Sequence, residues 1–176
     1  NLVSFHKINY EDLELSMIDK RSNETSHLKS DLQYYKSFME WGMDGETNAF
    51  LEEVLLWLSE NLPLSPNPKK LCWGDSRIGN VLFEDFQVKS LLDWEMATIG
   101  DPLCDLAWGL TTDDVSSHGL NIEKLPGSIA NEEAIKFWEK NTGFSAENFF
   151  YYRILCLFKF SVIMIRTNRT GFTCNV

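Results

Sequence analysis

The chain has 176 residues, enough for one domain with a substantial buried core. Hydrophobic residues make up 44% and charged residues 24%, a composition that excludes a disordered or fibrous chain. The formal net charge of −10 argues against a nucleic-acid-binding or anionic-membrane-binding surface, because such surfaces need clustered Lys and Arg.

Two amphipathic helices are predicted in the first third of the chain. Apolar and aromatic side chains recur at helical spacing from about residue 26 to 41, where Gly42 supplies a stop, and again from about 47 to 61. Pro63, Pro66 and Pro68 follow the second helix and cannot continue it. They predict an extended linker that reaches residue 70.

A small β-hairpin and three more helices are predicted further on. Short apolar runs at 81–83 and 88–92 flank a turn and indicate the hairpin. Asp101 as N-cap and Pro102 at the first helical position predict a helix to about Leu110. Helical spacing returns at 131–141 and 146–166, the last segment being rich in core residues. Residues 167–176 show no periodicity and are expected to form a poorly ordered tail.

The most apolar stretch does not read as a membrane helix. It runs from Phe149 to Ile165 and is interrupted by Arg153 and Lys159, so it falls short of the roughly 18 uncharged residues needed. The four cysteines are widely spaced and lack a CxxC pair, which indicates reduced thiols. No signal peptide opens the sequence, and we therefore expect a cytoplasmic protein without a membrane partner.

The polar residues of one segment point to phosphoryl transfer. The stretch WGDSRIGN places Asp75 and Asn80 five positions apart, and Asp93 follows the predicted hairpin. Kinases use an Asp to accept the proton of the attacking hydroxyl, then an Asn and a second Asp to hold Mg²⁺. Each residue alone could be a turn former or a strand end; the joint pattern favours the chemistry, since Mg²⁺ prefers hard oxygen ligands.

The segments LCWGDSRIGNVLF and LLDWEMATIGDPLCDLAWGL resemble the aminoglycoside phosphotransferase family, to which choline kinases are more distantly related. The similarity is closest to a branch that resembles kinase-like domains fused to some acyl-CoA dehydrogenases, and it covers residues 1 to about 166. It implies an α+β, mainly helical fold equivalent to the C-terminal lobe of a protein-kinase-like fold, with the small hairpin at the catalytic loop. ATP would be the co-substrate, and a small molecule would supply the acceptor hydroxyl.

The same resemblance implies a role for each site residue. Asp75 would be the catalytic base, Asn80 and Asp93 the Mg²⁺ ligands, and Asp105 would brace the catalytic loop through its backbone. Most members carry His at the position of Trp73, where it organises the loop, so Trp73 is expected to give structural support instead.

The nucleotide-gripping N-terminal lobe of the family is not recognisable. No GxGxxG motif and no strand-borne Lys paired with a helix-borne Glu precedes Asp75. We therefore expect this lobe to lie ahead of residue 1 and to act as a partner of the present chain, which would begin inside a domain.

Several alternatives stay open at this point. The acceptor could be an aminoglycoside, a hydroxylated acyl-CoA-type metabolite or another alcohol. The chain could also be a catalytically silent kinase-like binding or regulatory domain, or, less well supported, a magnesium-dependent hydrolase. Glu95 could touch metal-bound water or be merely solvated. Arg77 is expected to form a surface ion pair, and Trp94 and Trp108 are expected to pack in the core.

Overall fold

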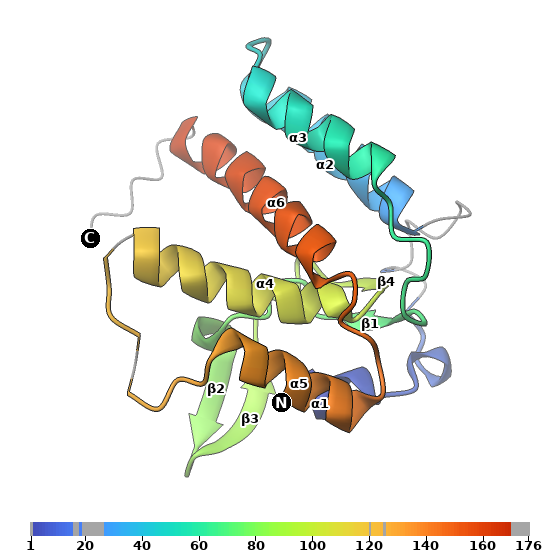
Figure 1. Ribbon diagram of the computed structural model, residues 1–176, viewed down its shortest axis with the longest axis vertical. Helices are drawn as coiled ribbons and strands as arrows, with labels where there is room; N and C mark the ends of the chain where they lie inside the picture. The colour runs from blue at the N-terminus through green and yellow to red at the C-terminus, as the bar shows by residue number, and fades with distance from the viewer. Residues whose placement is uncertain (1, 16–17, 19–26, 120, 125, 170–176) are drawn as a thin grey trace.

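The computed structural model describes residues 2–15, 18, 27–119, 121–124 and 126–169. Six α-helices and two antiparallel strand pairs make up the regular structure of this part of the chain (Figure 1). The predicted α+β, mainly helical fold is confirmed. The helices are α1 (Leu2–His6), α2 (His27–Met43), α3 (Ala49–Glu60), α4 (Leu103–Asp114), α5 (Asn131–Thr142) and α6 (Phe149–Arg169), and the strands are β1 (Lys70–Cys72), β2 (Val81–Glu84), β3 (Gln87–Leu91) and β4 (Thr98–Gly100).

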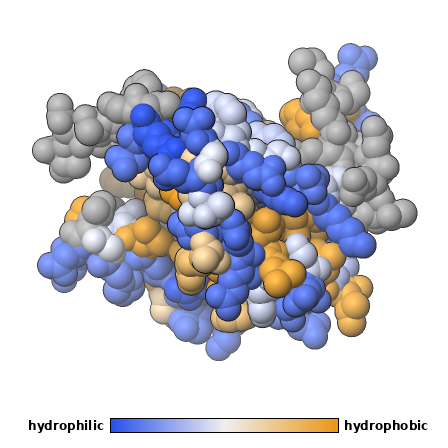
Figure 2. Space-filling view, turned by 90° about the horizontal axis from the view of Figure 1, so that it is seen from above, coloured by the Kyte–Doolittle hydropathy of each residue, from blue (hydrophilic) through white to orange (hydrophobic). Residues whose placement is uncertain are grey.

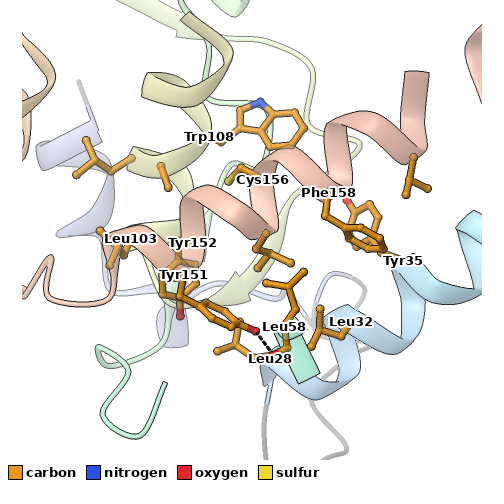
Figure 3. Packing of buried hydrophobic residues seen from close by; sticks show 14 of the residues in the cluster. Leu28, Leu32, Tyr35, Leu58, Leu103, Trp108, Tyr151, Tyr152, Cys156 and Phe158 are labelled. Carbon is orange, nitrogen blue, oxygen red and sulfur yellow. Dashed lines mark hydrogen bonds between the residues drawn. The ribbon is translucent and has the colours of Figure 1, made fainter. Parts of the chain in front are cut away.

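Helix α6 is the centre of the core. It lies between α4 on one side and the α2–α3 pair on the other (Figure 1). The side chains that meet there come from all four helices, as Figure 3 shows for Leu32, Leu58, Leu103 and Phe158. Each of these residues is at most 5% exposed. Removing this apolar surface from water is what holds the helices together.

The predicted bounds of α2 and α3 agree with the structure to within two residues at each end, but Gly42 does not stop α2, which continues through it to Met43. Asn48 caps α3, because its Oδ1 accepts a hydrogen bond of 3.2 Å from the backbone N–H of Leu51. The linker that follows α3 forms no helix or strand before β1 begins at Lys70, as the three prolines predicted.

The predicted hairpin is formed by β2 and β3, which pair Val81 with Leu91 at the base and Glu84 with Gln87 at the tip. Asp85 and Phe86 make the two-residue turn, with φ values of 48° and 60°. Positive φ at both turn positions matches the right-handed twist of the strands. The second pair, β1 with β4, was not predicted. Its strands have three residues each, and its residues lie far apart in the sequence.

Helix α4 starts one residue later and ends four residues later than predicted. Pro102 precedes the helix instead of opening it, and the helix continues to Asp114 before a π-helical turn at Val115–Gly119. The N-cap position is Pro102 and not Asp101 as predicted, but the Asp101 side chain still satisfies the start of the helix, since its Oδ1 accepts a 2.9 Å hydrogen bond from the N–H of Leu103. Its Oδ2 also accepts from the hydroxyl of Tyr152 at 2.9 Å, which ties α6 to the start of α4.

Helix α6 also runs past its predicted end. Thr167, Asn168 and Arg169 are helical, so the prediction that they begin a poorly ordered tail is wrong for these three residues. The remainder of that predicted tail, residues 170–176, lies outside the described residues. Within the described ranges no helix is long and apolar enough to cross a membrane.

One lysine interrupts the apolar face of α6. Lys159 is 5% exposed, and its ammonium group forms an ion pair with the carboxylate of Asp31 on α2. The ammonium also lies 4.7 Å from the ring centroid of Tyr35. Burial alone would lower the pKa of Lys159, but the neighbouring Asp31 carboxylate holds this pKa well above its usual value. The buried charge is therefore compensated inside the core.

The surface is mostly hydrophilic with separate apolar patches, as Figure 2 shows for the face seen from above. A groove of about 610 Å³ lies between α2 and α3. Its walls combine apolar side chains such as Leu32, Met39 and Leu55 with Lys29 and Lys36.

An ionic cluster at the end of α4 joins three parts of the chain. The carboxylate of Asp114 accepts from Lys124 Nζ at 3.0 Å, from Asn131 Nδ2 at 2.9 Å and from Arg153 Nη2 at 3.1 Å. Partial burial by itself raises the pKa of Asp114, but these donors and charges outweigh it and hold the pKa below the ordinary value.

This cluster predicts an acid-sensitive contribution to stability. A carboxyl group with a depressed pKa stabilises the fold above its unfolded-state pKa, near 3.8, and loses that contribution as the pH falls through the folded-state pKa. Asp114→Asn is therefore expected to lower the unfolding free energy at pH 7, and the gap to the wild type is expected to narrow below about pH 4. Urea unfolding at several pH values measures this gap. Asp44→Asn, at an exposed position, is the control, and a gap that stays constant with pH would contradict the assignment.

Candidate active site

The loop that contains Asp75, here called the Asp75 loop and comprising residues 73–80, is fastened to the start of α4. Asp105 is 1% exposed and accepts two backbone hydrogen bonds from this loop: 2.7 Å from the N–H of Trp73 and 2.8 Å from the N–H of Gly74. The hydroxyl of Ser76 donates to the backbone carbonyl of Asp105 at 2.5 Å. These contacts are the ones that the resemblance implies for Asp105.

Glycine is required at two points where the Asp75 loop meets its neighbours. Gly74 has a φ of 90°, and a Cβ at this position would lie 2.3 Å from the carbonyl oxygen of Met96. Gly109 on α4 faces the loop, and a Cβ there would lie 2.8 Å from the carbonyl oxygen of Ser76. Both separations are too short for a side chain, so the loop packs at backbone distance on both sides.

Asp75 and Asn80 lie in direct contact, as their spacing predicted. Asp75 is 7% exposed. Its Oδ2 accepts from Asn80 Nδ2 at 2.7 Å and forms an ion pair with Arg77 Nε at 3.0 Å, while its Oδ1 accepts from Trp108 Nε1 at 2.7 Å. Arg77 thus forms an ion pair, as predicted, and its partner is the candidate base itself. The Asp75 carboxylate is held in one orientation by two N–H donors and by the ion pair with Arg77.

The same carboxylate retains room for a substrate. An ionised carboxylate has about four lone-pair sites; Asn80 and Trp108 use two of them, and the Arg77 guanidinium lies beside Oδ2. The donor from Trp108 comes from the core side, where this residue is 4% exposed, whereas the Arg77 side chain is 53% exposed. A hydroxyl group approaching from solvent can therefore be accepted by Asp75 once Arg77 gives way.

Asp93 reaches the same end of the hairpin as Asn80. Val81 pairs with Leu91 in the β2–β3 register, and one step further the N–H of Leu92 donates to the carbonyl oxygen of Asn80 at 2.8 Å. Asp93 follows directly, with a φ of 60° and an exposed side chain. Its carboxylate makes no hydrogen bond or ion pair within the described part of the chain. The structure therefore brings the backbones of Asn80 and Asp93 together and leaves the Asp93 carboxylate open.

These two residues fit a magnesium site in which waters and substrate phosphates supply the remaining ligands. Asn80 uses its amide N–H group toward Asp75, so its carbonyl oxygen has no donor among the described residues. Mg²⁺ is bound in kinases by one or two carboxylates together with waters and substrate phosphates. No cluster of three His, Cys, Asp or Glu side chains that could hold a metal alone occurs in the described ranges. The amide oxygen of Asn80 and the carboxylate of Asp93 suit the kinase arrangement, in which waters and phosphates complete the site.

Trp73 gives support in a different way from a loop histidine. It is 2% exposed and packs in a small core cluster with Phe5, Leu71 and Ile99. Its Nε1 donates to the carbonyl oxygen of Leu92 at 2.7 Å. This bond ties the Asp75 loop to the residue that precedes Asp93, so both loops share one anchor.

Trp94 lies at the exposed edge of that cluster, with its ring 5.6 Å from that of Phe5 and 6.2 Å from that of Trp73. Trp94 is 42% exposed, so the prediction that it packs in the core is wrong. Its Nε1 donates to the carbonyl oxygen of Leu91 at 2.8 Å, which holds the indole at the end of the hairpin near the solvent. Glu95 is also exposed and has no hydrogen bond or ion pair to the described residues, in keeping with its solvated alternative.

Sequence reasoning missed three residues that shape the site. Trp108 was predicted to pack in the core, and it is buried, but its hydrogen bond to Asp75 was not foreseen. Ser76 and Gly109 fix the contact between the Asp75 loop and α4. Helical spacing offered a signal for two of them, because Trp108 and Gly109 follow Asp105 by three and four positions and so share its face of α4.

Solved structures share this architecture over nearly the whole chain. A protein from Ralstonia eutropha, described as a candidate aminoglycoside phosphotransferase, superposes with a TM-score of 0.78 at 18% identity, covering 99% of this chain and 56% of that chain. A macrolide 2'-phosphotransferase of type I gives a TM-score of 0.61 at 14% identity, covering 97% of this chain and 52% of that one. The chain therefore has the fold found in these aminoglycoside and macrolide phosphotransferase structures.

The sequence profile of the phosphotransferase enzyme family matches residues 1–134. The chain belongs to this family, and the resemblance seen in its motifs is confirmed. Acyl-CoA dehydrogenase family member 11 from Pongo abelii is 32% identical over 124 residues, covering 64% of this chain and 16% of that protein. The corresponding protein from Gallus gallus is 32% identical over 126 residues with the same shares. The chain thus matches only a small part of these curated relatives.

Proposed function

We propose that this chain forms the catalytic lobe of an ATP-dependent phosphotransferase that moves the γ-phosphate to a hydroxyl group of a small molecule. The observation that carries the proposal is the environment of Asp75: a carboxylate on a braced loop, oriented by Trp108 and Asn80, which can accept a hydroxyl group when the exposed Arg77 side chain moves away. Family membership supports it, because kinases of this family use ATP.

Each residue has a role in this scheme. Asp75 accepts a hydrogen bond from the acceptor hydroxyl, aligns its oxygen with the γ-phosphorus and takes up its proton as the new O–P bond forms and the bond from the γ-phosphorus to the departing ADP breaks. Asn80 and Asp93 would hold Mg²⁺, which neutralises charge on the phosphate oxygens when it is bound. Asp105 and Trp73 keep the two loops in register through the backbone of residues 73, 74 and 92. Most of the catalysis is positioning and electrostatic stabilisation.

We propose that the present chain and an N-terminal lobe of the same protein bind ATP between them. The present chain corresponds to little more than half of each phosphotransferase structure that it resembles. Its curated relatives are longer proteins of which it matches 16%. We place the reaction in the cytoplasm, where ATP is supplied and thiols stay reduced.

The acceptor is proposed to be a small alcohol. The names of the curated relatives favour a hydroxylated acyl-CoA-type compound, whereas the net charge of −10 would suit a cationic aminoglycoside. Transfer of labelled γ-phosphate from ATP to a panel containing hydroxyacyl-CoA thioesters, aminoglycosides and simple alcohols separates these classes. Phosphate appearing only as free phosphate would instead favour hydrolysis.

A catalytically silent binding domain is the second candidate. The observation that favours it is the ion pair between Arg77 and Asp75, because the guanidinium lies on an oxygen that the acceptor hydroxyl could use. Arg77→Gln distinguishes the two functions. Phosphate transfer that persists or increases in this variant supports the enzyme, whereas transfer absent from both proteins supports the silent domain.

The metal assignment predicts the behaviour of one conservative variant. Asp93→Asn is expected to lower the Mg²⁺-dependent affinity for ATP about tenfold or more, because it removes the only carboxylate proposed as a ligand. Titration calorimetry with ATP, with and without Mg²⁺, measures this in the natural polypeptide that contains these residues. Asn tolerates the left-handed backbone of this position, so folding is expected to be unchanged.

Glu95→Gln is the matched control for this titration. Glu95 is an exposed acid two positions away, and its replacement is expected to leave the heat of binding unchanged. Equal Mg²⁺-dependent heats of ATP binding in the wild type and in Asp93→Asn would contradict the assignment of Asp93 as a metal ligand. A heat of ATP binding that does not depend on Mg²⁺ in the wild type would contradict the proposed metal site as a whole.

A further inference from the structure

A buried histidine lies behind the residue that braces the Asp75 loop. His6, the last residue of α1, is fully buried. Its Nε2 lies 3.1 Å from Oδ2 of Asp105, and its Nδ1 lies 3.1 Å from Nε1 of Trp138 on α5. The three side chains therefore form a chain of contacts from α5 through α1 to α4.

The partners of the imidazole fix its proton. The indole N–H of Trp138 can only donate, so Nδ1 of His6 must be the acceptor. The ring is then neutral with its proton on Nε2, and this N–H donates to Asp105. Oδ2 of Asp105 thus accepts from His6 and from the N–H of Trp73, while Oδ1 accepts from the N–H of Gly74.

The donor from His6 matters because a carboxylate rotates easily. The terminal torsion of Asp is broad and is not held in a sharp rotamer well. Two donors from adjacent backbone N–H groups come from one side of Asp105, and the His6 donor comes from another element. The third bond fixes the plane of the carboxylate, so that both oxygens meet the two N–H groups directly ahead of Asp75.

We propose that His6 is a positioning residue for the reaction, acting through Asp105 on the backbone that carries Asp75. The catalytic consequence of this inference rests on the proposed function, but the structural coupling does not. His6 lies 99 positions from Asp105, so the coupling joins the start of the described chain to the site. It makes the position of α1 a determinant of the geometry of the Asp75 loop.

A purely structural role would give a different pattern. The His6 ring also packs against Phe5, with centroids 5.7 Å apart, and meets Trp138 edge to face at 6.0 Å. His6→Phe keeps an aromatic ring and removes the donor to Asp105. His6→Gln offers a side-chain N–H at about the reach of Nε2 and should restore that donor. Trp138→Phe removes the contact at Nδ1 and leaves the Asp105 contact in place.

Amide hydrogen exchange measured by NMR tests the coupling without any substrate. In His6→Phe the amides of Trp73 and Gly74 are expected to exchange roughly tenfold faster or more, since a hydrogen bond to a charged group is lost. The amides of Tyr152 and Leu155 in the core of α6 should keep their wild-type rates. His6→Gln and Trp138→Phe are expected to stay close to the wild type at residues 73 and 74.

The outcomes separate this inference from the proposed function. Unchanged exchange at residues 73 and 74 in folded His6→Phe, or equal acceleration in His6→Phe and His6→Gln, overturns the positioning role. If His6→Phe does not fold, His6→Asn, whose amide is too short to reach Asp105, replaces it under the same criteria. Mg²⁺-dependent ATP hydrolysis, with water as the acceptor, is then expected to fall roughly tenfold in the donor-less variant and to recover in His6→Gln. Exchange that responds in a protein that transfers no phosphate from ATP to water or to any hydroxyl acceptor supports the coupling of His6 to the Asp75 loop and contradicts the proposed function.

Discussion

Asp75→Asn is expected to lower phosphate transfer by about 100-fold or more, because the acceptor hydroxyl loses the group that takes its proton. The amide also turns one N–H group toward existing donors, either Trp108 on one side or Asn80 and Arg77 on the other. Part of the loss would therefore come from a shifted side chain. Initial rates with labelled ATP, in the natural polypeptide containing these residues, measure the effect.

The control for this variant is Asp85→Asn at the tip of the hairpin. Asp85 is exposed and has a φ of 48°, a backbone conformation that Asn tolerates, so both stability and transfer should stay unchanged. Thermal unfolding of Asp75→Asn separates misfolding from lost chemistry. Transfer at the wild-type rate in a folded Asp75→Asn protein would refute its role as the base.

Lys159→Met is expected to lower the free energy of unfolding by about 3–5 kcal/mol, because it leaves the buried Asp31 carboxylate without its ammonium partner. Asp31 is 2% exposed, so water cannot replace the lost partner without opening the contact between α2 and α6. Denaturant unfolding measures the change. The double variant Asp31→Leu/Lys159→Met is expected to recover most of the loss, since no charge then remains buried.

The exposed ion pair of Lys36 with Glu40 provides the comparison for the buried one. Its side chains are 49% and 60% exposed and their charged atoms are 3.9 Å apart. Lys36→Met is expected to change stability by no more than about 0.5 kcal/mol. A cost of similar size for Lys159→Met would mean that the buried pair contributes little more than a surface pair.

Local patterns predicted most of the helices because each helix buries one face. Apolar residues of α2 and α3 recur at helical spacing, and Asn48 and Pro63 mark the two ends of α3, so the predicted bounds agreed with the structure to within two residues. The end of α4 was missed, because no glycine or proline follows Leu110 to stop the helix and Asp114 is held by partners from later segments. Contacts with distant segments can extend a helix although the local sequence at its end carries no signal for them.

In the site, too, local contacts could be predicted from the sequence and contacts between distant segments could not. Asp75 and Asn80 belong to one loop, and their spacing in the sequence sets their contact. Trp73 is 2% exposed and Trp94 is 42% exposed, a difference that no local pattern in the sequence indicated. The bond between His6 and Asp105 spans 99 positions, and no periodic pattern connects residues so far apart. Tertiary packing alone decides such contacts.

The β2–β3 hairpin offers a position for a spectroscopic probe that reports movements near the candidate site. Its base adjoins Asn80 and Asp93, while the Phe86 ring at its tip is fully solvent-exposed and packs on nothing in the described chain. A fluorophore or spin label attached there would leave every bond around Asp75 intact. Because the two strands are paired along their length, small tilts of the base would be read out as larger displacements of the probe.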